Sequence, residues 1–171
     1  LNILPKPIAD RLKLGEEIIA DSFAEVTVLF ADIVNFTPLS VHMSPAEMIV
    51  LLNDIFSTFD DLAARSGLEK IKTIGDTYMA ACGLCTPLLD NTRRAVKFAL
   101  EMQRIVKRFN AENNQSLKLT VGISAGPVVA GIVGRDKFIY DVWGDTVNMA
   151  ARMENHSGHG EISISEAVYY E

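Results

Sequence analysis

The chain has 171 residues, enough for one domain with its own core, and its 49% hydrophobic and 22% charged residues are ordinary for a globular protein. A formal net charge of −6 argues against nucleic-acid binding, which needs a basic face, although a bound cation could still hold a phosphate ligand. No apolar run approaches the roughly 20 residues that span a bilayer, and no signal peptide is recognisable.

Residues 1–21 carry Pro5, Pro7 and Gly15 among mixed charges. This composition predicts a short helix and a linker that lie outside the core. A start at Leu1 rather than Met favours a fragment of a longer protein. We therefore expect one domain over 22–171, preceded by a linker over 1–21 that joins it to other modules.

The first predicted strand covers 25–32 and ends at Asp32. A helix over 44–67 follows, in which Ser44 is the N-cap, Glu47 completes a capping box and Gly67 ends the helix. Its apolar residues recur at helical spacing and predict one buried stripe, made of Met48, Leu52, Ile55, Phe59 and Leu62.

The later elements begin with a predicted β-hairpin over 68–83 that turns at Gly75-Asp76. Then follow a helix over 91–113, strands over 116–126, 127–134 and 137–144, a helix that Asp145 caps, and a strand after Gly160. The core order β-α-β-β-α-β is that of a ferredoxin-like α+β fold, in which helices pack on one face of an antiparallel sheet.

Two carboxylates fall at places that this fold brings together. Asp32 ends the first strand and Asp76 lies in the hairpin turn, next to that strand in the predicted sheet. Close carboxylates repel each other unless a cation lies between them, and hard oxygen ligands suit Mg²⁺ or Mn²⁺. A turn role explains Asp76 alone, because Gly-Asp is a common turn pair. A cap role explains Asp32 poorly, because no helix start follows it.

Cys82 and Cys85 form a C-x-x-C pattern that His156 and His159 could complete as a zinc site. The spacing is far from that of a zinc finger, and the cysteines follow a strand-like segment. We therefore expect buried or half-buried inert thiols.

Three motifs together resemble the catalytic domain of class III nucleotidyl cyclases: FADIVNFT at 30–37, KTIGDTYMAACG at 72–83 and YDVWGDTVNMAARME at 140–154. The resemblance covers about residues 24–170. It implies two Mg²⁺ or Mn²⁺ ions per active site, bound by Asp32, Asp76 and the backbone carbonyl of Ile33. It also implies that backbone amides of the next segment hold the triphosphate, namely those of Asn35, Phe36 and Thr37.

The same resemblance assigns roles to two residue pairs. Asn148 would orient the ribose, and Arg152 would stabilise charge in the transition state. Lys72 and Asp141 match the two base-reading positions. They provide one donor and one acceptor, the set that complements adenine, which points to ATP rather than GTP.

Arg135 and Lys137 are further candidates for contact with the triphosphate, although the register of that loop is open. The resemblance thus predicts an adenylate cyclase that closes ATP to 3′,5′-cyclic AMP and releases pyrophosphate. Because one chain carries both halves of the site, we expect a head-to-tail homodimer with shared sites and no nucleic-acid partner.

The linker over 1–21 favours a parent protein with a membrane or sensor module, and the catalytic domain itself is expected to be a soluble domain in the cytoplasm. Three alternatives stay open: a guanylate cyclase, a non-catalytic nucleotide-binding regulatory module, and a diguanylate cyclase, whose GGDEF-type signature is missing.

Overall fold

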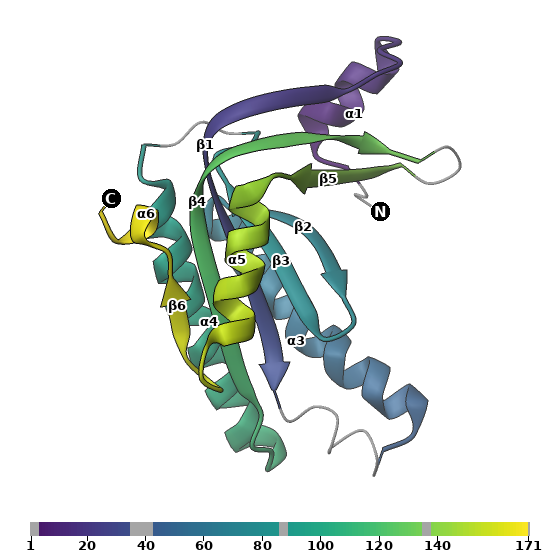
Figure 1. Ribbon diagram of the computed structural model, residues 1–171. Coiled ribbons are helices and arrows are strands. Elements are labelled where there is room, and N and C mark those ends of the chain that lie inside the picture. Colours follow the sequence, from purple (N-terminus) through teal and green to yellow (C-terminus); the bar gives the residue numbers. More distant parts are fainter. Residues whose placement is uncertain (1–3, 35–42, 86–88, 135–137, 171) are drawn as a thin grey trace.

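The computed structural model describes residues 4–34, 43–85, 89–134 and 138–170. Its centre is a six-stranded sheet with the order β2-β3-β1-β4-β5, in which β6 pairs with β4 (Figure 1). The strands are β1 (Ala20–Val34), β2 (Glu69–Ile74), β3 (Thr77–Cys82), β4 (Lys118–Val133), β5 (Ile139–Trp143) and β6 (Ile162–Ile164). The helices are α1 (Lys6–Lys13), α3 (Pro45–Ser66), α4 (Asn91–Asn113), α5 (Asp145–His156) and α6 (Glu166–Tyr169).

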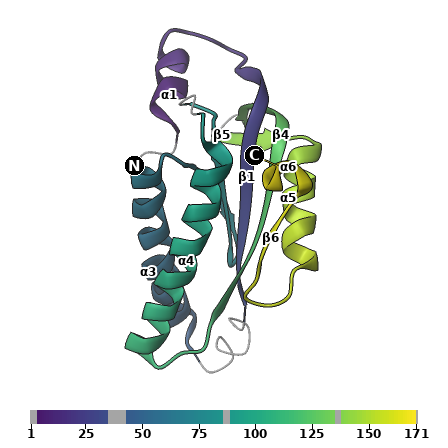
Figure 2. The same ribbon diagram turned by 90° about the vertical axis from the view of Figure 1, so that its left-hand side faces the viewer.

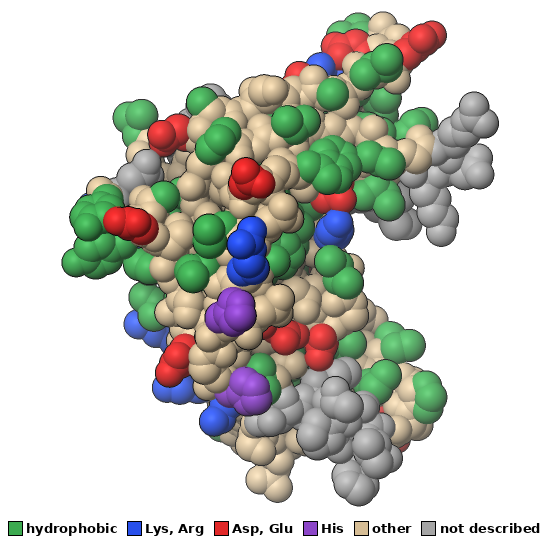
Figure 3. Space-filling view, viewed as in Figure 1, with side chains coloured by type: hydrophobic (Ala, Val, Ile, Leu, Met, Phe, Trp, Pro, Cys, Tyr) green, Lys and Arg blue, Asp and Glu red, His purple; other side chains and the backbone are tan. Residues whose placement is uncertain are grey.

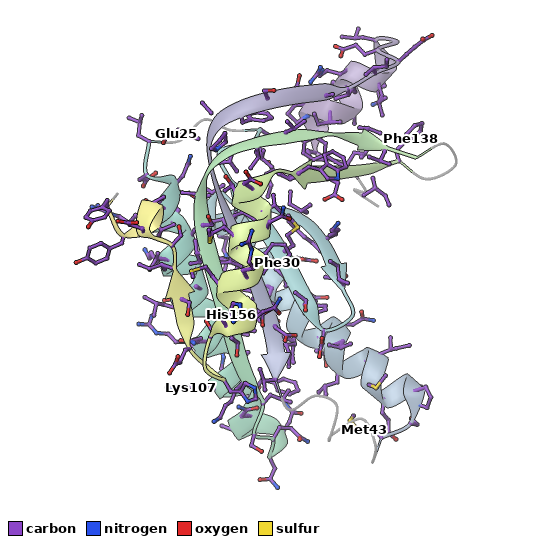
Figure 4. All side chains as sticks on the ribbon, in the orientation of Figure 1. Glu25, Phe30, Met43, Lys107, Phe138 and His156 are labelled. Carbon is purple, nitrogen blue, oxygen red and sulfur yellow. The ribbon has the colours of Figure 1, made fainter. Side chains whose placement is uncertain are left out.

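The sheet separates two apolar clusters because side chains alternate along each strand. On β1, Leu29, Ala31 and Ile33 face the cluster beneath the long helices α3 and α4. Val28 and Phe30 face the opposite cluster, which includes residues of α1 and α5. Figure 2 shows α3 and α4 on one side of the sheet and α5 on the other, and Figure 4 shows Phe30 beside α5.

The predicted antiparallel α+β sheet is confirmed, and the long helices cover one face as expected. Two features extend that prediction. α5 and α1 cover part of the second face, and β6 runs parallel to β4 rather than antiparallel. Within the described residues, no helix combines the length and the apolar character needed to cross a bilayer.

The ends of α3 follow the predicted signals. Ser44 Oγ accepts a hydrogen bond from the backbone N–H of Glu47 at 3.2 Å, which is the first half of the predicted capping box. Gly67 adopts a left-handed conformation with φ of 78° and terminates the helix. The predicted bounds of α4 and the hairpin of β2 and β3 around Gly75-Asp76 are confirmed as well.

Two of the predicted boundaries that were wrong lie in the second half of the chain. β4 is one continuous strand through Pro127, not two strands. Proline lacks an N–H group, but a strand tolerates it at an irregularity, and the register between β1 and β4 shifts at Phe23/Val26, opposite this point. Asp145 is the first residue of α5 and not its N-cap, which is Gly144.

The N-terminal segment is also more integrated than its composition indicates. Ile8 of α1 and Ile19 are buried in the cluster that contains Phe30, which corrects the prediction that residues 1–21 contribute nothing to the core. β1 already begins at Ala20. The linker role of this segment stays a prediction.

Candidate active site

Asp32 and Asp76 lie side by side at one end of the β1–β3 ladder. Asp32 pairs with Thr77 across the two strands, and Thr77 Oγ1 donates a hydrogen bond to Asp32 Oδ1 at 3.1 Å. The backbone N–H of Ile33 donates to the backbone oxygen of Asp76 at 3.1 Å. The two acidic residues are therefore fixed by the same ladder, as the sequence order predicted.

A third acid, Glu154 of α5, joins this pair, and the sequence analysis did not identify it. Burial and the charges of Asp32 and Asp76 raise the pKa of Glu154 to about 7. Burial and then the nearby Asp32 raise the pKa of Asp76 as well. Both shifts have the direction that half-buried carboxylates show when they crowd together without a counterion.

Nothing positively charged offsets this crowding among the described residues, because no lysine or arginine there forms an ion pair with any of the three acids. Oxygen donors that repel each other fit a divalent cation such as Mg²⁺. The part of the chain that the structure describes contains no group of three or more Asp, Glu, His or Cys side chains arranged as metal ligands. A cation held by Asp32 and Asp76 would therefore complete its shell with backbone oxygen, water or substrate.

The orientation of α5 follows from its contact with β4. A Cβ atom on Gly122 would lie 2.2 Å from the backbone nitrogen of Glu154 and 2.4 Å from the carbonyl oxygen of Ala150. Only glycine allows the helix to approach the strand this closely. Ala150 and Glu154, four residues apart, thus form the face of α5 that lies on the sheet.

Asn148 and Arg152 occupy a different face of the same helix. Each lies two residues from a sheet-facing position, which is about half a turn away. Both are exposed, whereas Ala150 is fully buried. Arg152 is therefore directed away from the acids of its own chain.

Lys72 and Asp141 meet although they are 69 residues apart. Lys72 Nζ donates to Asp141 Oδ2 at 2.7 Å, and the Asp141 side chain is only 15% exposed. The backbone N–H of Val142 donates to the other Asp141 oxygen at 2.8 Å. Asp141 is thus held in place by its own strand, with one oxygen committed to Lys72.

Four other predicted site residues lie outside the described residues: Asn35, Phe36, Thr37 and Arg135. Lys137 is outside them too. Ile33, the predicted backbone ligand, is described; its side chain is buried in the core.

The two cysteines are free thiols, with Cys82 buried and Cys85 half-buried. Burial raises the pKa of each to about 11, so neither thiol is activated. Cys82 Sγ lies 3.4 Å from Asn91 Oδ1. These surroundings fit the expected inert thiols.

Comparison with known proteins identifies the family of this chain. A family model described as the adenylate and guanylate cyclase catalytic domain matches residues 18–170. An adenylate cyclase of Mycobacterium tuberculosis is 45% identical over 169 residues, which are 98% of this chain and 38% of that protein. A membrane guanylyl cyclase of Dictyostelium discoideum is 37% identical over 169 residues, which are 98% of this chain and 11% of that protein. The chain spans less than half of either relative.

Among solved structures, the catalytic core of a rhodopsin-guanylyl cyclase with converted specificity, in complex with ATPαS, superposes with a TM-score of 0.84. It is 40% identical, and the match covers 88% of this chain and 82% of that chain. The family model spans nearly the whole chain and the relatives share its sequence at this level. The chain therefore belongs to the family of adenylate and guanylate cyclase catalytic domains.

Proposed function

We propose that this domain is an adenylate cyclase, which converts ATP to 3′,5′-cyclic AMP and pyrophosphate at sites shared between two copies of the chain. The ribose 3′-oxygen forms a bond to the α-phosphorus, the bond from that phosphorus to the pyrophosphate oxygen breaks, and the hydroxyl proton is released. We expect the domain to act in the cytoplasm, where ATP is available.

The observation that carries the shared site is the outward orientation of Arg152. A triphosphate held near Asp32 and Asp76 needs a positive side chain at its reacting phosphate, yet Arg152 lies on the opposite face of α5 from Glu154, and Asn148 is also exposed and lies off the sheet-facing side. One chain cannot bring these groups to one substrate without rebuilding α5. A second copy can, because its own α5 would present an exposed Arg152 to the substrate held at the first copy's acids.

An exposed apolar surface beside α5 supports this pairing. Four side chains of the arm formed by 129–133 and 139–143 are more than two-fifths exposed: Val129, Val133, Ile139 and Trp143. Figure 3 shows hydrophobic side chains exposed over this arm, and Figure 4 shows Phe138 at its far end. Contiguous apolar surface of this kind is typical of protein–protein interfaces.

The Lys72–Asp141 pair supports ATP as the substrate. Adenine presents an acceptor at N1 and a donor at its amino group, so a lysine donor and a carboxylate acceptor complement it. Guanine has the opposite order of donor and acceptor. Because some relatives are guanylyl cyclases, GTP is the alternative substrate. Rates measured in parallel with ATP and with GTP distinguish an adenylate from a guanylate cyclase.

A bound divalent cation would neutralise the triphosphate and make the ribose hydroxyl easier to deprotonate. The chain's own residues then bind and orient the substrate. Asp32 and Asp76 supply carboxylate oxygens, while Lys72 and Asp141 hold the base. Arg152 donates hydrogen bonds where negative charge develops on the phosphate, so that preorganised charge stabilises the transition state.

Mixing two inactive variants tests the shared site. We expect Asp32→Ala and Arg152→Ala each to make almost no cyclic AMP from ATP with Mn²⁺. Mixed dimers contain one site with both groups intact, so the mixture should recover a substantial fraction of the wild-type rate. If both variants dimerise and the mixture stays inactive, the shared site is wrong. If the wild type makes no cyclic AMP but binds ATP, the regulatory-module alternative gains instead.

A further inference from the structure

The two lysines of β2 lie on opposite faces of the sheet, although they are two residues apart. In a regular strand, residues i and i+2 share a face. Here Lys70 pairs with Ala80 and Lys72 pairs with Met79, so Ile71 is an extra residue in a β-bulge. Ala80 belongs to the cluster beneath α3 and α4, and Met79 belongs to the opposite cluster.

Lys70 is held on the α3 face by Asp60 of that helix. Lys70 Nζ lies 3.0 Å from Asp60 Oδ2, and Tyr78 Oη donates to Asp60 Oδ1 at 2.8 Å. Lys70 Nζ also lies 5.7 Å from the centre of the Tyr78 ring. Asp60 thus joins α3, β2 and β3 through one carboxylate.

Tyr78 is a rigid anchor for this contact. Its side chain is fully buried, and its ring packs against three phenylalanines of α3 and α4: Phe56, Phe59 and Phe98. Burial and the bond to Asp60 raise the pKa of Tyr78, so its hydroxyl keeps its proton and stays a donor. The carboxylate of Asp60 is therefore fixed relative to the sheet.

Apart from this contact, two side chains of the described part of β2 support its register: Ile71 packs against the cluster that contains Phe30, and Lys72 forms the ion pair with Asp141. β2 is an edge strand of the described sheet and is hydrogen-bonded only to β3. A shift of one residue along β3 would move every β2 side chain to the other face. If the bulge closed while Lys70 stayed opposite Ala80, Lys72 would turn toward α3 and away from Asp141.

We propose that Asp60 is a positioning residue for base recognition: through Lys70 and Tyr78 it fixes the bulge at Ile71, which turns Lys72 to the face where Asp141 lies. This inference rests on the proposed role of Lys72. Asp60 meets Lys70 on the α3 face of the sheet, whereas Lys72 meets Asp141 on the other face. It acts on the choice between ATP and GTP through the register of an edge strand.

The test compares the ratio of kcat/KM for ATP to kcat/KM for GTP among variants. Lys70→Met removes the charge but keeps the length of the side chain, and Asp60→Asn removes the charge at the other end. We expect each to raise KM for ATP and to lower the ATP preference roughly tenfold or more, as small displacements of a binding group do. Lys70→Arg keeps an ion pair and should retain the preference.

Asp61→Asn is the matched control. Asp61 is the exposed neighbour of Asp60 on α3. Among the described residues its backbone oxygen accepts a hydrogen bond from Arg65, and its carboxylate forms no ion pair. A merely structural role of Asp60 would lower thermal stability and the active fraction but leave the ATP to GTP ratio unchanged. That outcome for Lys70→Met and Asp60→Asn would overturn the inference.

Lys72→Ala and Asp141→Ala separate this inference from the proposed function. If they leave the ATP preference intact, the base-reading role fails, and the inference fails with it. If they abolish the preference while Lys70→Met and Asp60→Asn keep it, only the positioning role of Asp60 is wrong. A change in both sets supports both proposals.

Discussion

Replacing Gly122 by alanine tests how closely α5 must sit on the sheet. The added Cβ would lie 2.2 Å from Glu154 N, 2.4 Å from Ala150 O and 2.9 Å from Glu154 Cα. All three are backbone atoms of α5, so no side-chain rotation relieves the contact. Ordinary contacts between heavy atoms are about 3.5 Å, so the helix must retreat by roughly 1 Å.

The size of the effect follows from this overlap. Alanine is otherwise favoured over glycine within a strand by roughly 0.5–1 kcal/mol, so a loss of stability must come from the overlap itself. Overpacking of this kind costs about 1–3 kcal/mol. For a domain of this size each kcal/mol lowers Tm by about 2–4 °C, so we expect a fall of about 2–12 °C.

Thermal unfolding followed by circular dichroism measures this change, and the rate of cyclic AMP formation measures its effect on the site. α5 carries Asn148 and Arg152, and a displacement near 1 Å can lower turnover about a hundredfold. Gly158→Ala is the control, because an added Cβ there meets only the carboxylate end of the flexible Glu161 side chain and no backbone atom. A Gly122→Ala protein with unchanged Tm and turnover would refute the close approach of α5.

Three further outcomes are expected. The pKa of Glu154 is raised from 4.5 to about 7, so its ionisation lowers stability progressively as pH rises from about 4.5 to about 7. The loss is complete above this range and absent below it. Glu154→Gln should therefore have a higher free energy of unfolding than wild type at pH 8 in the absence of metal, by ~1–2 kcal/mol after allowance for solvent screening. Urea unfolding measures this difference, and the two proteins should be similar near pH 4.5. With thiol pKa values of about 11, Cys82 and Cys85 should react slowly with a disulfide reagent at pH 7.5 until urea unfolds the chain, and fast reaction of the folded protein would contradict their burial. Ser44→Ala removes the cap of α3 and should lower the free energy of unfolding by about 1 kcal/mol, whereas Ser44→Asp should preserve it.

Local signals predicted the long helices well because each signal acts through its own backbone. Ser44 and Gly67 determine where α3 ends whatever the rest of the chain does. β1 was predicted too short because the run of buried residues on both faces covers only 26–31, whereas 20–24 alternate between exposed and half-buried and Glu25 is exposed. A hydrophobic run therefore marks the doubly covered part of the strand and not its whole length.

The acidic pair was predictable because chain order alone places Asp32 beside the hairpin turn. Glu154 was not, because its approach to Asp32 depends on Gly122, a residue of β4 that bears no local relation to α5. The shared role of Lys72 and Asp141 was predicted from the family resemblance, because no periodicity relates residues that are 69 positions apart.

The bulge at Ile71 shows the limit of periodicity most clearly. Strict alternation assigns Lys70 and Lys72 to one face, and a reader of the sequence must choose which of the two serves the site. The structure lets both lysines have separate partners, Asp60 on one face and Asp141 on the other. Because of the extra residue between them, one edge strand places Lys70 against α3 and Lys72 beside Asp141.

The same sorting by face is the reason for proposing a site shared between two copies. β1 and the hairpin turn gather acids, and α5 turns Glu154 toward them. The phase of that helix then directs Arg152 outward, away from the negative charge that it is suited to neutralise. Rotating α5 to bring Arg152 inward would lift Ala150 off Gly122 and lose the packing that positions the helix. The charge imbalance within one chain is thus a consequence of how α5 packs, and the proposed second copy would bring Arg152 to the site without unpacking the fold.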